Sequence, residues 1–488
     1  MNTKIIIFLI ILLSVVLRIY GIEDKNLWFD EVYSWKISQN NVTGIISATA
    51  GDIHPPLYYL VLKLWTNIFS DNIASMRLLS CLFGILSLIL IYKLSKKFLG
   101  SDLQIIFVLL LYTVSPLNIY YSQEVRMLNL NLLLCLGSVF YFFNFLEKQN
   151  IKSGIIYTLY SILAIYTHYF AFLILFTQLF IVLIKFFLDV KDKKPLFNFL
   201  KYFFVIFLFY SPWIGVFIDQ TSKGQPWRTE QTFREVGKSL MDYFKDTFLS
   251  TYYTFESNAL IFFASIFSIF IILFLALSVI RIMNERSFLT KKENHIFLFF
   301  IVPLFIALII SFRQSLVLSR YLSILLPYLF IALVYFVYKF YKPRTSFILC
   351  TLLILISSYG TYINFSNNFK SNDYRKIISY LENNFRDGDQ IIAEPHFMGW
   401  SIDYFVKHND TKIVKPTVLG WDLKMQIDSL EHLNDYNNVW VISDYSALDK
   451  SKYDSLKILM QEKNYKQLQK KSFYLIPSKV NVEYYTKP

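Results

Sequence analysis

The sequence predicts a polytopic α-helical membrane protein that carries a soluble α/β domain at its C-terminal end. Of its 488 residues, 55% are hydrophobic and 19% are aromatic, which is more apolar surface than one soluble core uses. Windows long enough to cross a bilayer, with almost no charge, recur up to residue 364. After residue 364 charged residues and asparagine become frequent, and the long apolar windows stop.

The apolar windows predict about eleven transmembrane helices. They fall near residues 4–20, 73–95, 103–120, 127–146, 153–168, 169–188, 200–218, 259–281, 295–312, 321–340 and 345–364. The first window follows a charged start, as in a signal peptide, but it lacks a small-residue cleavage site. We therefore expect it to be a retained helix.

Lysine and arginine residues collect in every second connection between these windows, at 93–97, 148–152, 185–201, 281–292 and 339–344. The positive-inside rule then places the N-terminus in the cytoplasm and residues 365–488 outside it, in a multi-pass membrane protein. This topology accounts for the net charge of +13 without nucleic-acid binding. The cysteines Cys81, Cys135 and Cys350 lie inside apolar windows, which excludes a disulfide framework and a cysteine-rich metal site.

Two domains follow from these patterns: a transmembrane domain at 1–364, with a first outer loop at 21–72, and an extracytoplasmic domain at 365–488. The outer loop contains amphipathic segments, and Pro55 and Pro56 are expected to start a helix with His54 just before it. In the outer domain we expect strands at 390–394, 411–415 and 438–443 and helices at 373–384, 397–407, 422–433 and 451–463, hence an α/β layer fold. It has no glycine fingerprint or phosphate loop, so no nucleotide is assigned to it.

The predicted topology collects the unusual polar motifs on the outer face. These are WFDEVYSW with Asp30 and Glu31, His54 before the paired prolines, SQEVR at 122–126, YTHY at 166–169, KGQPWR at 223–228 and SRY at 319–321. Acidic residues are costly near lipid and persist there mainly for chemistry or ion handling. One outer-face site could therefore gather these motifs.

A transferase outside the cytoplasm needs a donor that reaches it through the bilayer, and a lipid-linked sugar phosphate meets that need. Its phosphate leaves as an anion without a general acid, so one carboxylate suffices to take the proton of the acceptor hydroxyl. Guanidinium groups would stabilise the charge that develops on the phosphate. Arg126 and Arg320, both at predicted outer helix ends, are the candidates.

The DE pair, HPPLYYL, YSQEVRMLNL, YTHYF and SRYL together resemble the bacterial family 39 type glycosyltransferases with the GT-C fold. These are related to protein O-mannosyltransferases and lipid A aminoarabinose transferases. The resemblance covers residues 1 to about 364, and DYRKIISYLENNFRDGDQII resembles the outer domain of many bacterial members. It implies a polyprenyl-phosphate sugar donor and inverting transfer to a lipid, glycan or protein acceptor of the cell envelope. The lipid A transferases place an acid and a lysine before the paired prolines, where this chain has Ile53 and His54, so their phosphate-binding lysine and metal site are not carried over.

The motifs, the chemistry of the donor and the resemblance together predict a site. The resemblance puts Asp30 at the catalytic acid position, where we expect it to act as base, with Glu31 as its supporting neighbour. We expect His54, Arg126, Arg320 and Tyr321 to bind the donor phosphate, and the cavity to be lined by Tyr121, Gln123, Glu124, His168, Trp227 and Arg228. No cofactor is required, and a divalent metal is compatible with the reaction but not demanded by a monophosphate donor.

Other functions and roles stay open at this level. A secondary transporter has a similar number of spans, although transporters usually carry broken or polar helices at mid-membrane. A lipid-linked glycan polymerase or ligase, or a non-catalytic envelope assembly protein, are further alternatives. The site residues also have structural readings: solvated loop acids (Asp30, Glu31), a helix-end brace (Glu124, Arg126), a polar group before a helix (His54), a packing histidine (His168), snorkelling (Arg320) and an interfacial anchor (Trp227, Arg228).

Overall fold

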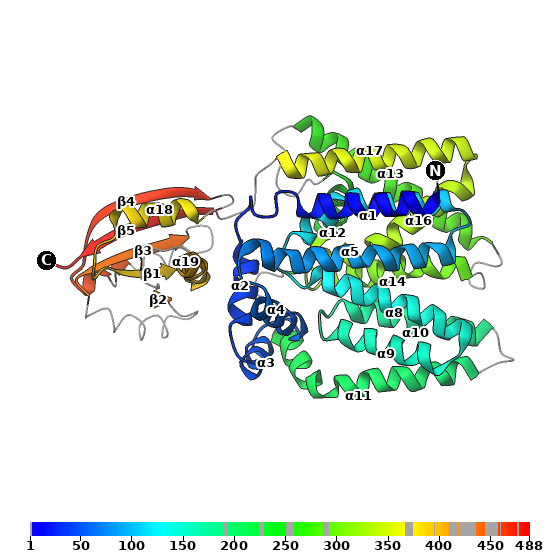
Figure 1. The fold of residues 1–488 in the computed structure, drawn as a ribbon, viewed down its shortest axis with the longest axis horizontal. Helices are drawn as coiled ribbons and strands as arrows, with labels where there is room; N and C mark the ends of the chain where they lie inside the picture. The colour runs from blue at the N-terminus through cyan, green and yellow to red at the C-terminus, as the bar shows by residue number, and fades with distance from the viewer. Residues whose placement is uncertain are drawn as a thin grey trace. The chain divides into compact units, whose positions relative to one another are not determined.

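A computed structural model (Figure 1) describes residues 2–188, 194–223, 229–249, 258–285, 292–366, 374–394, 396–408, 413, 417–418, 436–444, 457–458, 460–475 and 478–488. The chain forms two compact units. The first comprises Met1–Ile22, Asn41–Ile68 and Met76–Asn367, and the second comprises Glu23–Asn40, Phe69–Ser75 and Asn368–Pro488. The second unit therefore includes two stretches of the predicted first outer loop.

The first unit is helical. Its elements are α1 (Thr3–Ile19), α3 (Val42–Ala50), α4 (Leu57–Ile68), α5 (Ile73–Phe98), α6 (Asp102–Val114), α7 (Pro116–Ser122), α8 (Leu128–Lys148), α9 (Ile151–Ile165), α10 (Ala171–Leu188), α11 (Lys194–Lys223), α12 (Phe233–Phe248), α13 (Asn258–Met283), α14 (Lys292–Ser311), α15 (Ser319–Leu322), η1 (Ser323–Leu325), α16 (Leu326–Phe340) and α17 (Pro343–Ser366). Each predicted apolar window coincides with one of these helices or with a consecutive run of them. Helices α8, α9 and α11 lie side by side, as Figure 1 shows.

Within the described ranges, seven helical segments are long and apolar enough to cross a membrane: α5, α8, α11, α13, α14, the run from α15 to α16, and α17. The pair α6 and α7 would add an eighth span, bent by 55°. Helices α9 and α10 are apolar but shorter, and α1 has 17 residues. The polytopic helical class is confirmed, while about eleven crossings stays a prediction.

The bend between α6 and α7 lies at Ser115 and Pro116. Proline has no N–H to donate and is favoured at the first position of a helix, so it starts α7 in a new direction. Side chains of α17 donate to the backbone at this break: Thr361 to the carbonyl of Val114 at 2.8 Å and Asn364 to that of Pro116 at 3.0 Å. Helix α17 thereby holds the break at which α7 begins.

A fully buried arginine ties α1 to the same region. Arg18 donates to Ser14 Oγ at 2.5 Å and to Ser122 Oγ at 3.2 Å, and its guanidinium lies 5.3 Å from the centre of the Tyr112 ring. Gly84 of α5 leaves room for this cluster, because a Cβ there would lie 2.8 Å from Ser122 Oγ. No residue pattern predicts that Arg18 is buried among hydroxyl groups.

The second unit contains a five-stranded sheet of order β2-β1-β3-β5-β4. Strand β1 is parallel to β2 and β3, whereas β5 is antiparallel to β3 and β4. The strands are β1 (Gln390–Glu394), β2 (Thr417–Val418), β3 (Asn438–Asp444), β4 (Lys466–Leu475) and β5 (Ser478–Thr486), and the helices are α2 (Phe29–Ser38), α18 (Arg375–Asn384) and α19 (His396–His408). The core between them contains Ile392, Val439, Val441, Met460, Tyr465 and Tyr485.

The expected α/β fold of the C-terminal domain is confirmed. Strands β1 and β3 and helices α18 and α19 coincide with the predicted elements, but β4 and β5 were not predicted. The predicted strand at 411–415, apart from Ile413, and the predicted helix at 422–433 lie outside the described residues, as does much of the predicted helix at 451–463.

Candidate active site

Predicted site residues from distant parts of the first unit meet in one cluster. Arg126, in the turn after α7, lies with its Nη2 atom 3.3 Å from Nε2 of His54, which is buried just before α4. A guanidinium can only donate hydrogen bonds, so the histidine nitrogen is the acceptor. This assigns the proton of a neutral His54 ring to Nδ1.

His168 continues the cluster from the connection between α9 and α10. Its ring lies 5.4 Å from that of His54 at an interplanar angle of 88°, and its Nδ1 atom accepts from the backbone N–H of Phe170 at 3.1 Å. On its other side lies Tyr321 of α15, with ring centres 5.4 Å apart. The cluster thus contains His168, which is predicted to line the cavity, together with three predicted phosphate ligands, His54, Arg126 and Tyr321.

Arg320 stands at the far end of this cluster. Its guanidinium lies 5.0 Å from the centre of the Tyr321 ring, within the range of a cation–π contact. Arg126 and Arg320, two cations from segments about 200 residues apart, therefore flank one row of aromatic and imidazole rings. The predicted grouping of His54, Arg126, Arg320 and Tyr321 corresponds to this arrangement.

A cavity of about 610 Å³ opens beside the cluster, with His54 and His168 in its wall. The rest of the wall is mostly aliphatic and aromatic and comes from α10, α11 and the residues around the end of α14. It is lined by Ile53, Pro55, Tyr169, Phe170, Phe172, Leu173, Phe207, Tyr210, Ile214, Phe217, Ile218, Thr221, Ile310, Gln314 and Leu316. Its size suits a small molecule, and its chemistry suits an apolar chain with a polar end.

Tyr121, Gln123 and Glu124, which are predicted to line the cavity, are buried but do not belong to the wall described above. Gln123 donates to the backbone carbonyls of Arg18 and Tyr20, at 3.1 and 2.7 Å, and so ties the end of α7 to α1. Tyr121 and Glu124 are 4% and 1% exposed. Trp227 and Arg228 lie outside the described residues.

Asp30 and Glu31 lie in the first turn of α2, in the second unit. Carboxylates are favourable there because backbone N–H groups point out of a helix N-terminus. Glu31 is fully buried and its Oε2 atom accepts from the N–H of Trp28 at 3.2 Å, whereas Asp30 is half-buried. Glu31 therefore secures the helix start next to a more accessible Asp30, which suits the predicted roles of support and base.

One further residue was missed. Asp246 of α12 is 2% exposed and accepts a hydrogen bond at 2.5 Å from Ser319, the residue before Arg320. It helps to fix the short helix α15 that carries Arg320 and Tyr321. Spacing along the chain cannot reveal this contact, because α12 and α15 are separated by α13 and α14.

The described part of the chain contains no group of three or more histidine, cysteine, aspartate or glutamate side chains that could hold a metal ion. The cationic character of the cluster comes from its two arginines. An anion at this cluster would meet guanidinium and imidazole groups.

Known proteins resemble this chain in one segment of sequence and in fold. Residues 53–215, about a third of the chain, match the family model described as dolichyl-phosphate-mannose-protein mannosyltransferase. This segment contains His54, Arg126 and His168. No curated protein matches the sequence closely enough to count as a relative.

Two solved structures illustrate the shared fold. The archaeal oligosaccharyltransferase from Archaeoglobus fulgidus, in complex with an inhibitory peptide and a dolichol-phosphate, has 12% identity and a TM-score of 0.55, over 96% of this chain and 73% of that chain. ArnT from Cupriavidus metallidurans, bound to undecaprenyl phosphate, has 10% identity and a TM-score of 0.54, over 97% of each chain. The GT-C fold predicted from the motifs is confirmed. Together with the family match, it supports the predicted class of enzyme, a glycosyltransferase with a lipid-linked donor.

Proposed function

We propose that this protein is an inverting glycosyltransferase that moves one sugar from a polyprenyl-phosphate donor to a lipid, glycan or protein acceptor of the cell envelope. The reaction would take place on the outer face of the bacterial cytoplasmic membrane, where positive-inside topology puts the site. The observation that carries the proposal is the row from Arg126 through His54, His168 and Tyr321 to Arg320, beside an apolar cavity in the unit of apolar helices.

The cluster and the cavity match the two parts of such a donor. A phosphate is bound well by guanidinium groups, which offer several N–H donors in a fixed plane, and Arg126 and Arg320 flank the row. A prenyl chain that arrives from the bilayer keeps apolar surroundings in this cavity, because the wall is mostly aromatic and aliphatic. The similar structures that hold dolichol-phosphate and undecaprenyl phosphate support a polyprenyl-phosphate donor here.

The reaction then needs one proton acceptor. In the proposed step Asp30 takes the proton of the acceptor hydroxyl. At the same time the hydroxyl oxygen attacks the anomeric carbon of the donor sugar, from the side opposite the phosphate. The bond from that carbon to the phosphate oxygen breaks, the configuration inverts, and polyprenyl phosphate leaves with the bonding electron pair. The guanidiniums stabilise the charge that develops on this leaving group.

The test is transfer of label from radiolabelled polyprenyl-phosphate sugars to envelope extract by the purified full-length protein. Asp30→Asn should lower the rate by about 10²- to 10⁴-fold, the usual contribution of a general base. Asp24→Asn is the matched control, because Asp24 is an exposed acid a few residues earlier. Equal transfer by Asp30→Asn and the native protein would remove Asp30 from the mechanism, and no transfer from any donor would favour a transporter or an assembly protein.

A further inference from the structure

Helix α2, which carries Asp30, has only ten residues. Isolated helices shorter than about 12–15 residues are marginal in water, so packing must supply its order. Within the second unit that packing comes from α19. The position of Asp30 is therefore linked to a helix that lies more than 360 positions away in the sequence.

Aromatic contacts reach the start of α2. The ring of Trp400 stacks on Phe29, with centroids 6.5 Å apart and an interplanar angle of 13°, and it also lies 5.7 Å from the ring of Tyr33. Phe29 immediately precedes Asp30 in the same helical turn. Trp400 thus packs against the backbone segment from which the Asp30 side chain projects.

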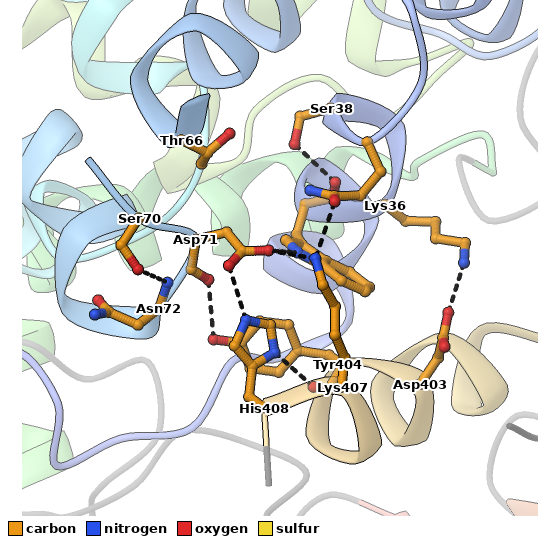
Figure 2. A network of polar contacts seen from close by, with 12 residues as sticks. Lys36, Ser38, Thr66, Ser70, Asp71, Asn72, Asp403, Tyr404, Lys407 and His408 are labelled. Atoms are coloured by element: carbon orange, nitrogen blue, oxygen red, sulfur yellow. Dashed lines mark hydrogen bonds and ion pairs between the residues drawn. The ribbon is translucent and has the colours of Figure 1, made fainter. Parts of the chain in front are cut away.

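Ionic contacts hold the other end of α2. Lys36 pairs with Asp403 of α19 at 2.6 Å. Asp71, just before α5, accepts from the indole N–H of Trp35 at 3.0 Å and lies 2.7 and 2.9 Å from the side-chain nitrogens of Lys407 and His408 (Figure 2). Asp71 thus joins α2, the segment before α5, and α19, which are remote from one another in the sequence.

The carboxylate of Asp71 stays ionised in this network. Burial would raise the pKa of Asp71, but the hydrogen bonds from Lys407, Trp35 and His408 outweigh that effect and hold the pKa well below its ordinary value. The network is thus charged at neutral pH and links α2 to α19 independently of Trp400.

We infer that α19 is a positioning element for the proposed reaction, in which Trp400 and Asp403 hold α2 and so set the direction of the Asp30 carboxylate. The inference rests on the proposed role of Asp30. A displacement of about 1 Å at a catalytic group can cost about 10²-fold in rate. The proposed donor site is built from residues of the first unit, so loss of these contacts should lower kcat and leave the KM for the donor unchanged.

The experiment compares kcat and donor KM in full-length Trp400→Ala and Asp403→Asn with native protein. We expect kcat to fall by about 10- to 100-fold for Trp400→Ala and less for Asp403→Asn, with KM within about twofold. Trp440→Phe is the matched control, because Trp440 is buried in β3 of the same unit and donates to Asp389 at 2.8 Å. If Trp440→Phe lowers kcat as much as Trp400→Ala, general stability of the unit explains the effect and the inference fails.

Two further variants separate positioning from simple destabilisation. The double charge swap Lys36→Asp with Asp403→Lys should recover most of the kcat lost in Asp403→Asn. In an Asp30→Asn background, Trp400→Ala should cause no further loss, because it acts through the group already removed. A charge swap that recovers nothing, or full additivity with Asp30→Asn, would overturn the inference.

The outcomes also separate this inference from the proposed function. If Asp30→Asn is inactive while Trp400→Ala has native kcat, the positioning role is refuted and the proposed function stands. If Asp30→Asn is fully active, the proposed function fails and the positioning role fails with it. Hydrogen exchange at the amides of α2 gives a readout apart from activity: it should rise in Trp400→Ala and stay native in Trp440→Phe.

Discussion

Replacing Arg126 by lysine tests the proposed donor site directly. Arg126 is half-buried and presents Nη2 to His54 at 3.3 Å, so its guanidinium plane is already oriented. Lysine keeps the positive charge but replaces the planar fork by a single ammonium group. The substitution therefore removes the planar set of N–H donors while it keeps the positive charge.

The expected cost follows from the loss of one charge-assisted hydrogen bond to the phosphate. Such bonds contribute about 1.5–3 kcal/mol, and every 1.4 kcal/mol is about tenfold in affinity. Arg126→Lys should thus weaken binding of a polyprenyl phosphate by about 10- to 150-fold. Arg126→Met, which removes the charge as well, should weaken it further.

The assay is equilibrium binding of tritiated polyprenyl phosphate to purified protein in detergent. Arg313→Lys is the control, because Arg313 is an exposed arginine just after α14. A change of less than twofold for Arg126→Lys, or the same change for Arg313→Lys, would refute the phosphate role of Arg126.

Three more predictions concern the cavity, the helix packing and the acid sensitivity of the second unit. Leu173→Trp should fill part of the cavity and abolish the increase in binding affinity from farnesyl phosphate to decaprenyl phosphate. An increase as large as in the native protein would show that the prenyl chain binds elsewhere. Gly360→Ala should destabilise the first unit by about 1–3 kcal/mol, because its Cβ would lie 2.7 Å from the Cα of Leu249, whereas Gly237→Ala, with no atom within 4 Å, should be neutral or stabilising in thermal unfolding. Because the pKa of Asp71 is lower in the folded state, the ionised carboxylate stabilises the second unit at pH values above the ordinary pKa of about 3.9. That stability is lost as the pH falls toward the lower pKa of the folded state. Asp71→Asn should therefore lower the melting temperature at pH 7 and make its decline below about pH 4 less steep. A decline as steep as in the native protein would contradict the stabilising role of ionised Asp71.

Much of the first unit could be predicted because apolar windows leave a strong signal in the sequence. Every window is helical, and the paired prolines before α4 start that helix where expected, with His54 just ahead of it. The predicted window at 103–120 does not show the break between α6 and α7, although the Ser115–Pro116 dipeptide is a recognisable signal for a new helix start.

The buried polar contacts could not be predicted, since they depend on which faces meet. In the sequence, Arg18 is only a cation near the end of an apolar window, and Asp246 is one of several charged residues in a polar segment. The lysines and glutamines of β4 hide the alternating pattern of a half-buried strand. Strand β5 does alternate, with Val480 and Val482 on either side of Asn481, and this signal was missed. The assembly of the second unit from three separate stretches leaves no local signal at all.

The contact between Lys36 and Asp403 also sets an order of events during synthesis. The two residues are 367 positions apart, and at about 5–20 residues per second the ribosome needs roughly 20–70 s to travel from one codon to the other. During that interval α2 has been synthesised but α19, which packs on it, has not. Most of the apolar helices of the first unit are made in the meantime. A nascent chain would thus contain the residues that line the cavity of the first unit before α2 gains the helix that packs on it.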